Sequence, residues 1–333
     1  MIRPPGTDKP EFEFALLGAG AIGSILGAHL ARAGHSVVML ARERRSRQIQ
    51  TDGLRITGLA EFSTPVHVLC DPSRLRSVSV LIVAMKTPGT AEALANLRGA
   101  DIGAAFSIQN GPLKNELLEN AFGTQRVLGS LADTSGEMLP SGEIVFTRNV
   151  NVFIGELSGE ASPRAQHIAR TIDASGVRAA AVENIQSVEW SKFSAWVGLM
   201  SLSVTTRAAT WKYLTDPGSA LVIARLVREM GLLAHALGIE LTDKSVLPVA
   251  TMCQGTEESA VGAVMQAGRE FELNARQHRM SSLQDLEAGR PLEIHETLGY
   301  ALQKAERCKI TLPLVETFYH VISAIDRTRV EQV

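Results

Sequence analysis

The chain has 333 residues, of which 45% are hydrophobic and 20% charged, and its formal net charge at pH 7 is −2. A charge this close to zero argues against nucleic acid or an anionic membrane as the main partner, and no apolar run reaches the roughly 20 residues of a membrane-spanning helix. The length suits two domains, and we interpret the polar, proline-rich residues 1–11 as a flexible leader that lacks the apolar core of a signal peptide.

A glycine-rich turn follows the first predicted strand. The apolar run Phe14–Leu17 predicts a buried strand, Ser24–Ala33 predicts a helix, and Val37–Ala41 predicts a second strand. Between the first strand and the helix stand Gly18, Ala19, Gly20, Ala21, Ile22 and Gly23. In such a unit the first glycine permits a tight turn, the second lets the backbone approach a pyrophosphate, and the third lets helix and strand pack closely. The pattern predicts a dinucleotide site, with the phosphates at the helix N-terminus.

The end of the second strand distinguishes between the two common nicotinamide cofactors. NAD sites usually place an acidic residue there, whereas NADP sites place an arginine nearby to pair with the 2′-phosphate. Arg42 is the first residue beyond this strand, and Arg44, Arg45 and Arg47 follow, with Glu43 as the one acidic residue. We predict NADP, bound through Arg42, and we expect Arg45 and Arg47 to be solvated side chains at the start of a helix.

Residues 12–185 continue with alternating strands and helices. The predicted strands are Val78–Ala84, Ala104–Ile108 and Val127–Leu131, and the predicted helices are Thr90–Leu97 and Leu113–Ala121. This alternation predicts a Rossmann-type, doubly wound parallel sheet. The segment 141–155 contains two short apolar runs, 143–146 and 151–155, and resembles a β-hairpin added to the sheet edge.

Two polar positions follow strands of this sheet. Ligands of open α/β sheets bind outside the carboxyl ends of the strands. Lys86 follows the strand that ends at Ala84, and Asn110, followed by Gly111, comes after the strand that ends at Ile108. Both are candidates for the substrate site; the alternatives are a solvated loop lysine and an Asn-Gly turn.

Residues 186–333 predict an all-α second domain. The helical patterns are Ser187–Thr206, Pro217–Leu237, Ser259–Leu273, Pro291–Cys308 and Pro313–Arg327. Lys192 shares a helical face with Trp196 and Met200, so it is either a functional cation or a lysine at the edge of an apolar face. Glu293 falls in the first turn of a predicted helix, where an acidic residue can also simply complement the helix dipole.

Neither the cysteines nor the histidines predict a metal site. The cysteines are Cys70, Cys253 and Cys308, which are far apart in sequence and fit a reducing cytoplasm. The eight histidines show no spacing typical of a zinc site, and we expect His29 and His235 to be packing or surface residues.

The motifs together resemble those of the ketopantoate reductase (2-dehydropantoate 2-reductase) family over almost the whole chain. They are the turn 18–23, Lys86, the run 109–111, the run 190–192 and, as the most specific, the run 281–294 (SSLQDLEAGRPLEI). The resemblance implies a Rossmann domain followed by a helical domain. It also implies NADPH-dependent reduction of ketopantoate to D-pantoate, a step toward pantothenate and coenzyme A.

The resemblance also implies residue roles. Lys192 matches the family's general acid, and Glu293 matches the acidic residue that assists substrate binding. Asn110 and Ser281 match substrate contacts, Lys86 matches a lysine near the nicotinamide, and Arg42 matches the arginine on the 2′-phosphate. A positioned ammonium can stabilise and protonate the alkoxide that hydride transfer creates.

Two positions depart from the family pattern. The family has asparagines four and eight residues after the catalytic lysine, where this chain has Trp196 and Met200. We therefore hold open a reductase of a different, more apolar 2-oxo acid, in which these two residues line the substrate site. A catalytically idle NADP-binding sensor or partner module is the alternative of another class. The apolar helical faces of the second domain also allow a homodimer.

Overall fold

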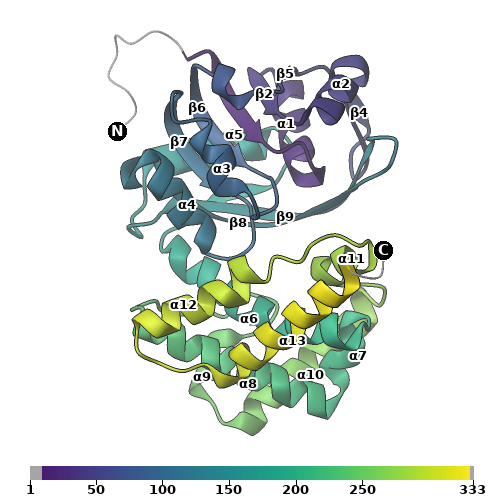
Figure 1. Ribbon diagram of the computed structural model, residues 1–333, viewed down its shortest axis with the longest axis vertical. Coiled ribbons are helices and arrows are strands. Elements are labelled where there is room, and N and C mark those ends of the chain that lie inside the picture. The colour runs from purple at the N-terminus through teal and green to yellow at the C-terminus, as the bar shows by residue number, and fades with distance from the viewer. Residues whose placement is uncertain (1–9, 331–333) are drawn as a thin grey trace. The chain divides into compact units, whose positions relative to one another are not determined.

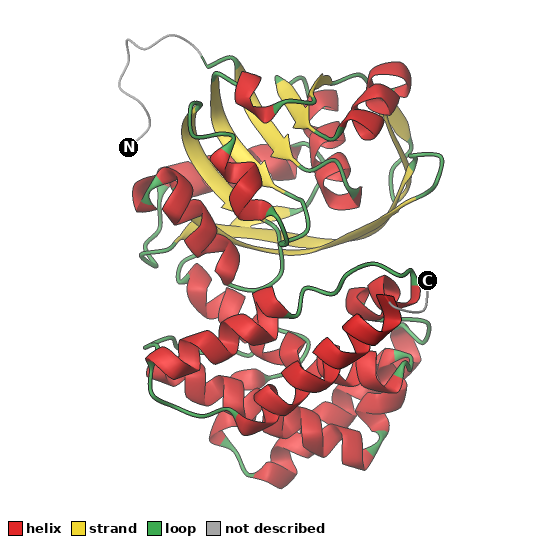
Figure 2. Ribbon diagram, viewed as in Figure 1, coloured by secondary structure: helices red, strands yellow, loops and turns green. Residues whose placement is uncertain are grey.

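The computed structural model describes residues 10–330, which form two compact units. Unit 1 comprises the chain up to Asn110 together with Lys114–Gln186, and unit 2 comprises Gly111–Leu113 together with the chain from Ser187 onward. Within the described range, every strand lies in unit 1, and the secondary structure of unit 2 is helical (Figure 2).

Unit 1 is built on a five-stranded parallel sheet. Its strands are β1 (Phe12–Leu17), β2 (Val37–Leu40), β5 (His67–Leu69), β6 (Ser77–Val83) and β7 (Asp101–Ser107). They are ordered β5-β2-β1-β6-β7, and all neighbouring pairs are parallel. The chain turns to one side of β1 for β2 and to the other side for β6. The carboxyl ends of β1 and β6 therefore form the topological switch point at which such sheets bind ligands.

The two faces of this sheet are covered by different elements (Figure 1). Alternate strand residues such as Leu16 and Ile82 share a core with helix α1 (Ala21–Arg32), whereas Leu17 and Val83 share another core with α3 (Thr90–Ala95) and α4 (Leu113–Phe122). This division follows from the period of two along a strand. It confirms the predicted doubly wound sheet.

A second sheet, which the sequence patterns did not predict, packs on the α1 side. It contains β3 (Leu54–Gly58), β4 (Phe62–Thr64), β8 (Leu128–Met138), β9 (Ile144–Glu156) and β10 (Ala179–Ala181), with α5 (Pro163–Ala174) against it. The strand order is β10-β9-β3-β4, and β8 pairs with β9. The run 127–131, expected in the parallel sheet, thus begins β8; a single bridge between Ala105 and Val127 connects it to β7.

The prediction of a β-hairpin within residues 141–155 was wrong. Residues 144–156 form one continuous strand, β9, whose antiparallel partner is β8, and together the two make the long pair visible in Figure 2. The turn lies at Ser141 and Gly142, and the latter has a φ of +83°. Arg148 and Asn149, which separate the two apolar runs, lie within β9, where the pairing with β8 shifts in register.

Three short helices complete unit 1: α2 (Glu43–Asp52) and the 3₁₀ turns η1 (Pro72–Arg74) and η2 (Thr124–Arg126).

The leader predicted over residues 1–11 extends into the folded part of the chain. Residues 1–9 lie outside the described residues, but the backbone N–H of Glu11 donates to Ser77 Oγ at 2.9 Å, and the Glu11 carboxylate accepts from the Arg76 N–H at 3.2 Å. Residue 11 therefore belongs to the folded unit.

Unit 2 consists of helices around one core. They are α6 (Ile185–Thr206), α7 (Thr210–Thr215), α8 (Pro217–Ala236), α9 (Val249–Gln254), α10 (Glu257–Asn274), α11 (Ser281–Glu287), α12 (Tyr300–Arg307) and α13 (Pro313–Val330). Side-chain caps mark two of the starts, because Asp216 accepts from the N–H of Ser219 and Thr256 accepts from that of Ser259. No helix among residues 10–330 is long and apolar enough to cross a membrane.

The helix predicted over 291–308 begins later than expected. Residues 290–293 are not helical, and the helix starts as a π-helical segment, His295–Gly299 (η3), that continues into α12. Arg290 explains this, because its N–H and its guanidinium both donate to Asp285, at 2.8 and 2.7 Å, and hold the chain in a loop after α11. Glu293 therefore precedes the helix rather than occupying its first turn.

Candidate active site

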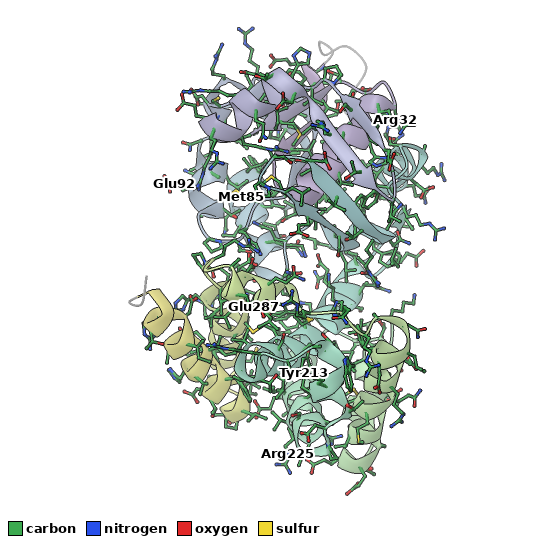
Figure 3. The ribbon with its side chains drawn as sticks, turned by 90° about the vertical axis from the view of Figure 1, so that its right-hand side faces the viewer. Arg32, Met85, Glu92, Tyr213, Arg225 and Glu287 are labelled. Atoms are coloured by element: carbon green, nitrogen blue, oxygen red, sulfur yellow. The ribbon has the colours of Figure 1, made fainter. Side chains whose placement is uncertain are left out.

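The glycine turn has the geometry that a dinucleotide requires. Gly18 has a φ of +110°, and a Cβ there would lie 2.7 Å from the backbone nitrogen of Met85, just after β6. A Cβ on Gly23 would collide with the carbonyl oxygen of Gly18. The chain itself therefore demands glycine at both positions. Figure 3 labels Met85, which marks this edge of the sheet.

Gly20 differs from its neighbours, because a Cβ there would meet no atom of the protein within 4 Å. Packing within the chain does not require glycine at this position, but close approach of a pyrophosphate would. Gly20 is also the N-cap of α1, and no side chain caps that helix. Its first amides, from Ala21 to Gly23, are suited to phosphate oxygens, so the turn fits a bound dinucleotide.

The arginines after β2 divide into two groups. Arg42, the N-cap of α2, is exposed, as are Arg44 and Arg47, and Arg47 pairs with Glu43. The expectation that Arg45 is solvated was wrong. Its guanidinium turns inward and donates to the carbonyl oxygen of Ala19 at 3.2 Å, because acceptors from distant segments converge there.

Gln109 connects the loops that carry Lys86 and Asn110. Its buried side-chain amide donates to the carbonyl oxygen of Met85 at 2.9 Å and to Thr90 Oγ1 at 2.7 Å. Lys86 itself is exposed, and Asn110 is half-buried. Gln109 belongs to the motif 109–111, but the sequence predicted no role for it. The signal that could have identified it is a polar residue directly after a buried strand.

Gly111 brings three motif segments together within unit 2. A Cβ built on it would lie 3.6 Å from Phe193 Cε2 and 3.7 Å from Thr297 Cγ2. Phe193 is adjacent to Lys192 on α6, and the Thr297 hydroxyl donates to the carbonyl oxygen of Glu293. The turn after Asn110, the helix of Lys192 and the segment of Glu293 therefore meet at one place.

The face of α6 around Lys192 is aromatic. Trp190 and Phe193 contact edge to face with ring centroids 5.8 Å apart, and Phe193 stacks on Trp196 at 6.5 Å. Lys192 is half-buried and Trp196 is 8% exposed. Met200 is only 1% exposed and lies, like Trp196, in the hydrophobic core of unit 2.

Ser281 and Glu293 lie at the two ends of the most specific motif. Ser281 is exposed at the start of α11, while the adjacent Ser282 is buried. Glu293 is half-buried, beyond the loop that Arg290 and Asp285 hold. Among residues 10–330, no group of three or more His, Cys, Asp or Glu is arranged to hold a metal ion.

A separate cavity of about 770 Å³ in unit 2 is lined by α8, α9 and the start of α13. Its charged residues already stabilise the fold. Arg225 pairs with Glu257, Arg228 donates to the last carbonyls of α9, and Glu229 accepts from the first amides of α13. In Figure 3, Arg225 lies at the opposite end of unit 2 from Glu287, the last residue of α11. This cavity is therefore not where the motif residues gather.

Two family models match the chain. The model described as ketopantoate reductase PanE/ApbA covers residues 14–159, and the one described as its C-terminal part covers residues 184–326. The chain belongs to the ketopantoate reductase family. A 2-dehydropantoate 2-reductase of Archaeoglobus fulgidus is 26% identical over 311 residues, which are 93% of this chain and 97% of the relative. The predicted family and an oxidoreductase activity are thereby confirmed.

Solved structures share the fold along almost the whole chain. A PanE/ApbA family ketopantoate reductase from Ralstonia eutropha is 22% identical, with a TM-score of 0.81 over 95% of this chain and 99% of that one. D-mandelate dehydrogenase with NADH and anilino(oxo)acetate gives the same TM-score and coverage at 17% identity. A dimeric ketopantoate reductase from Staphylococcus aureus gives 0.73 over 95% and 99% of the two chains, at 17% identity. These matches confirm a Rossmann-like domain followed by a helical domain.

Proposed function

We propose that this protein reduces 2-dehydropantoate to D-pantoate with NADPH, a step of pantothenate and coenzyme A biosynthesis. The observation that carries the proposal is the meeting of Gly111, Phe193 and Thr297. Gly111 and Phe193 each adjoin in sequence a residue with a proposed role in this reaction, and the Thr297 hydroxyl donates to the carbonyl oxygen of a third. Those residues are Asn110, Lys192 and Glu293. Membership of the ketopantoate reductase family supports the same reaction.

Cofactor binding falls to unit 1. The turn 18–23 and the uncapped start of α1 would hold the pyrophosphate, and Lys86 would lie toward the nicotinamide. Arg42, exposed directly after β2, would pair with the 2′-phosphate. When bound, the reduced nicotinamide supplies the hydride for the keto carbon.

The residues of the protein handle the charge that this reaction creates. Lys192 keeps its proton until negative charge develops on the keto oxygen, then donates it to the nascent alkoxide. Glu293 accepts a hydrogen bond from the substrate hydroxyl. Asn110 donates to the substrate, and Ser281 donates to its carboxylate.

A second candidate is the reduction of a more apolar 2-oxo acid by the same machinery. The stacked pair Phe193 and Trp196 favours it, because an indole now occupies the position of the family's asparagine. D-mandelate dehydrogenase, which shares the fold, has been solved with an aromatic ligand, anilino(oxo)acetate. Trp196, backed by Met200, would then line the pocket for the substrate side chain.

The deciding experiment compares 2-oxo acids with NADPH and with NADH. The most informative pair is 2-dehydropantoate and 3,3-dimethyl-2-oxobutanoate, which differ only in the substrate hydroxyl. A large preference in kcat/KM for 2-dehydropantoate supports the first candidate, and a preference for the acid without the hydroxyl supports the second. NADPH binding without turnover of any 2-oxo acid would indicate a sensor and contradict both.

We also propose a homodimer located in the cytoplasm. Leu232 on α8 and Val321 on α13 are 60% and 43% exposed, and a structural neighbour is described as dimeric. Free Cys70, Cys253 and Cys308 suit a reducing compartment. Sedimentation of wild type and Leu232→Glu tests the dimer, and a wild-type monomer would contradict it. Localisation of a tagged protein tests the compartment.

A further inference from the structure

Arg45 links four segments of unit 1 through its guanidinium group. Nε donates to the carbonyl oxygen of Ala19, in the glycine turn, and Nη2 donates to Ser24 Oγ, in the first turn of α1, both at 3.2 Å. Nη1 donates to Gln48 Oε1 and to the carbonyl oxygen of Gly142, both at 2.9 Å. One planar group thus ties the glycine turn to α2 and to the β8–β9 turn.

The far end of this connection is itself well fixed. Gln48 also donates through its side-chain amide to the carbonyl oxygen of Ser141, and Glu143 pairs with Arg55 of β3 at 3.1 Å. Gly142 has a φ of +83°, and a Cβ there would collide with Gln48. The β8–β9 turn therefore gives Arg45 a rigid point of attachment in the second sheet.

The partners of Arg45 are all neutral. They are two carbonyls, a hydroxyl and an amide oxygen, and within the described residues no carboxylate pairs with this guanidinium. Burial lowers the pKa of Arg45 from its usual value, with no opposing carboxylate. By contrast, exposed Arg47 on the same helix pairs with Glu43. An uncompensated cation thus lies beside the turn that would receive the pyrophosphate.

We propose that Arg45 is a positioning residue for dinucleotide binding, which holds the glycine turn in its phosphate-accepting form by bracing it against the β8–β9 turn. The inference rests on the proposed function. Because the pyrophosphate is common to NADPH and NADH, Arg45 acts on both cofactors equally. It leaves exposed Arg42 to distinguish between them.

The experiment measures dissociation constants of NADPH and NADH by fluorescence titration for wild type, Arg45→Ala, Arg45→Lys and the control Arg47→Ala. Loss of hydrogen bonds from a charged donor predicts that Arg45→Ala weakens both cofactors by the same factor, about tenfold. Lysine keeps the charge but cannot span three elements as a planar group, so we expect Arg45→Lys to rescue only part of the loss. Arg47→Ala should bind as the wild type does.

Amide hydrogen exchange without cofactor gives an independent readout. We expect faster exchange at residues 19–24 in Arg45→Ala than in Arg47→Ala. Weakening of NADPH alone would make Arg45 a 2′-phosphate ligand and overturn the proposal. Three other results would also overturn it: wild-type affinity in Arg45→Lys, unchanged amide exchange at residues 19–24 in Arg45→Ala, or a lowered melting temperature of Arg45→Ala with unchanged cofactor affinity. A wild type that binds neither cofactor refutes the proposed function and this role together. If the wild type binds NADPH and Arg45→Ala binds it with the same affinity, this role alone is refuted.

Discussion

The side-chain amide of Gln109 donates to the backbone carbonyl of Met85 at 2.9 Å and so ties the ends of two neighbouring parallel strands. The same nitrogen donates to Thr90 Oγ1, and Ser107 Oγ donates to the amide oxygen. Lys86 and Asn110 each follow directly from this buried network. Its integrity should therefore set how precisely those two side chains are held.

Replacing Gln109 with leucine should loosen both loops at once. The carbonyl of Met85 and the hydroxyl of Thr90 lose a buried donor, so we expect a loss of about 1–3 kcal/mol in the free energy of unfolding. We also expect kcat/KM for the 2-oxo acid to fall about tenfold. Urea denaturation and steady-state kinetics check these effects, with exposed Gln166→Leu as the control. Unchanged kinetics would remove Gln109 from the support of the site.

Lys192→Ala tests the proton donor. A positioned general acid contributes about 10²–10⁴-fold, so kcat should fall by that factor while NADPH still binds with wild-type affinity. Lys212→Ala removes an exposed lysine from α7 of the same unit and is the matched control. Near-normal turnover in the first variant would exclude Lys192 from the mechanism.

Arg42→Ala tests the choice of cofactor. Loss of a charge-assisted pair to the 2′-phosphate should weaken NADPH about tenfold or more and leave NADH almost unaffected. The dissociation constants of the two cofactors provide the measurement. Equal losses for both would contradict a contact between Arg42 and the 2′-phosphate.

Trp196→Asn restores the residue that the family has at this position. We expect the ratio of kcat/KM for 2-dehydropantoate over 3,3-dimethyl-2-oxobutanoate to rise, because the amide can bond the substrate hydroxyl. The stacking on Phe193 is lost, and truncation of a buried tryptophan costs about 3–5 kcal/mol, so the melting temperature is measured alongside. Half-buried Trp211→Asn is the control. An unchanged ratio in a folded variant would show that Trp196 does not set specificity.

The buried side chain of Tyr213 should make the free energy of unfolding depend on pH in the alkaline range. Burial raises the pKa of Tyr213 to about 12, while its hydroxyl donates to Thr210 Oγ1 at 3.4 Å. The unfolded chain releases this proton near pH 10, so the contribution is complete below pH 10 and is lost as pH rises toward 12. Between pH 9 and 11 the wild type should lose about 1–2 kcal/mol more than Tyr213→Phe in urea denaturation. Tyr319→Phe, on α13, should behave as the wild type does; equal losses in all three would contradict the prediction.

The local patterns of the sequence determined most of the elements and the class of the fold. The glycine turn, the strands on either side of α1 and the helices α6, α8 and α13 all appear where hydrophobic periodicity and the positions of glycine and proline predicted them. These features depend on residues within one or two turns of each other, so the sequence carries them directly. The family motifs, including the run 281–294, were likewise recognisable without coordinates.

Tertiary structure alone decided what depends on distant partners. The second sheet forms because β9 pairs with β3 and β10, and the hairpin signal at 141–155 could not reveal those partners. The sequence predicted a solvated side chain for Arg45, yet its guanidinium turns inward, because Ala19 and Gly142 supply acceptors from 26 and 97 residues away. Likewise, the meeting of Gly111, Phe193 and Thr297 results from chain folding over long separations, which no local pattern encodes.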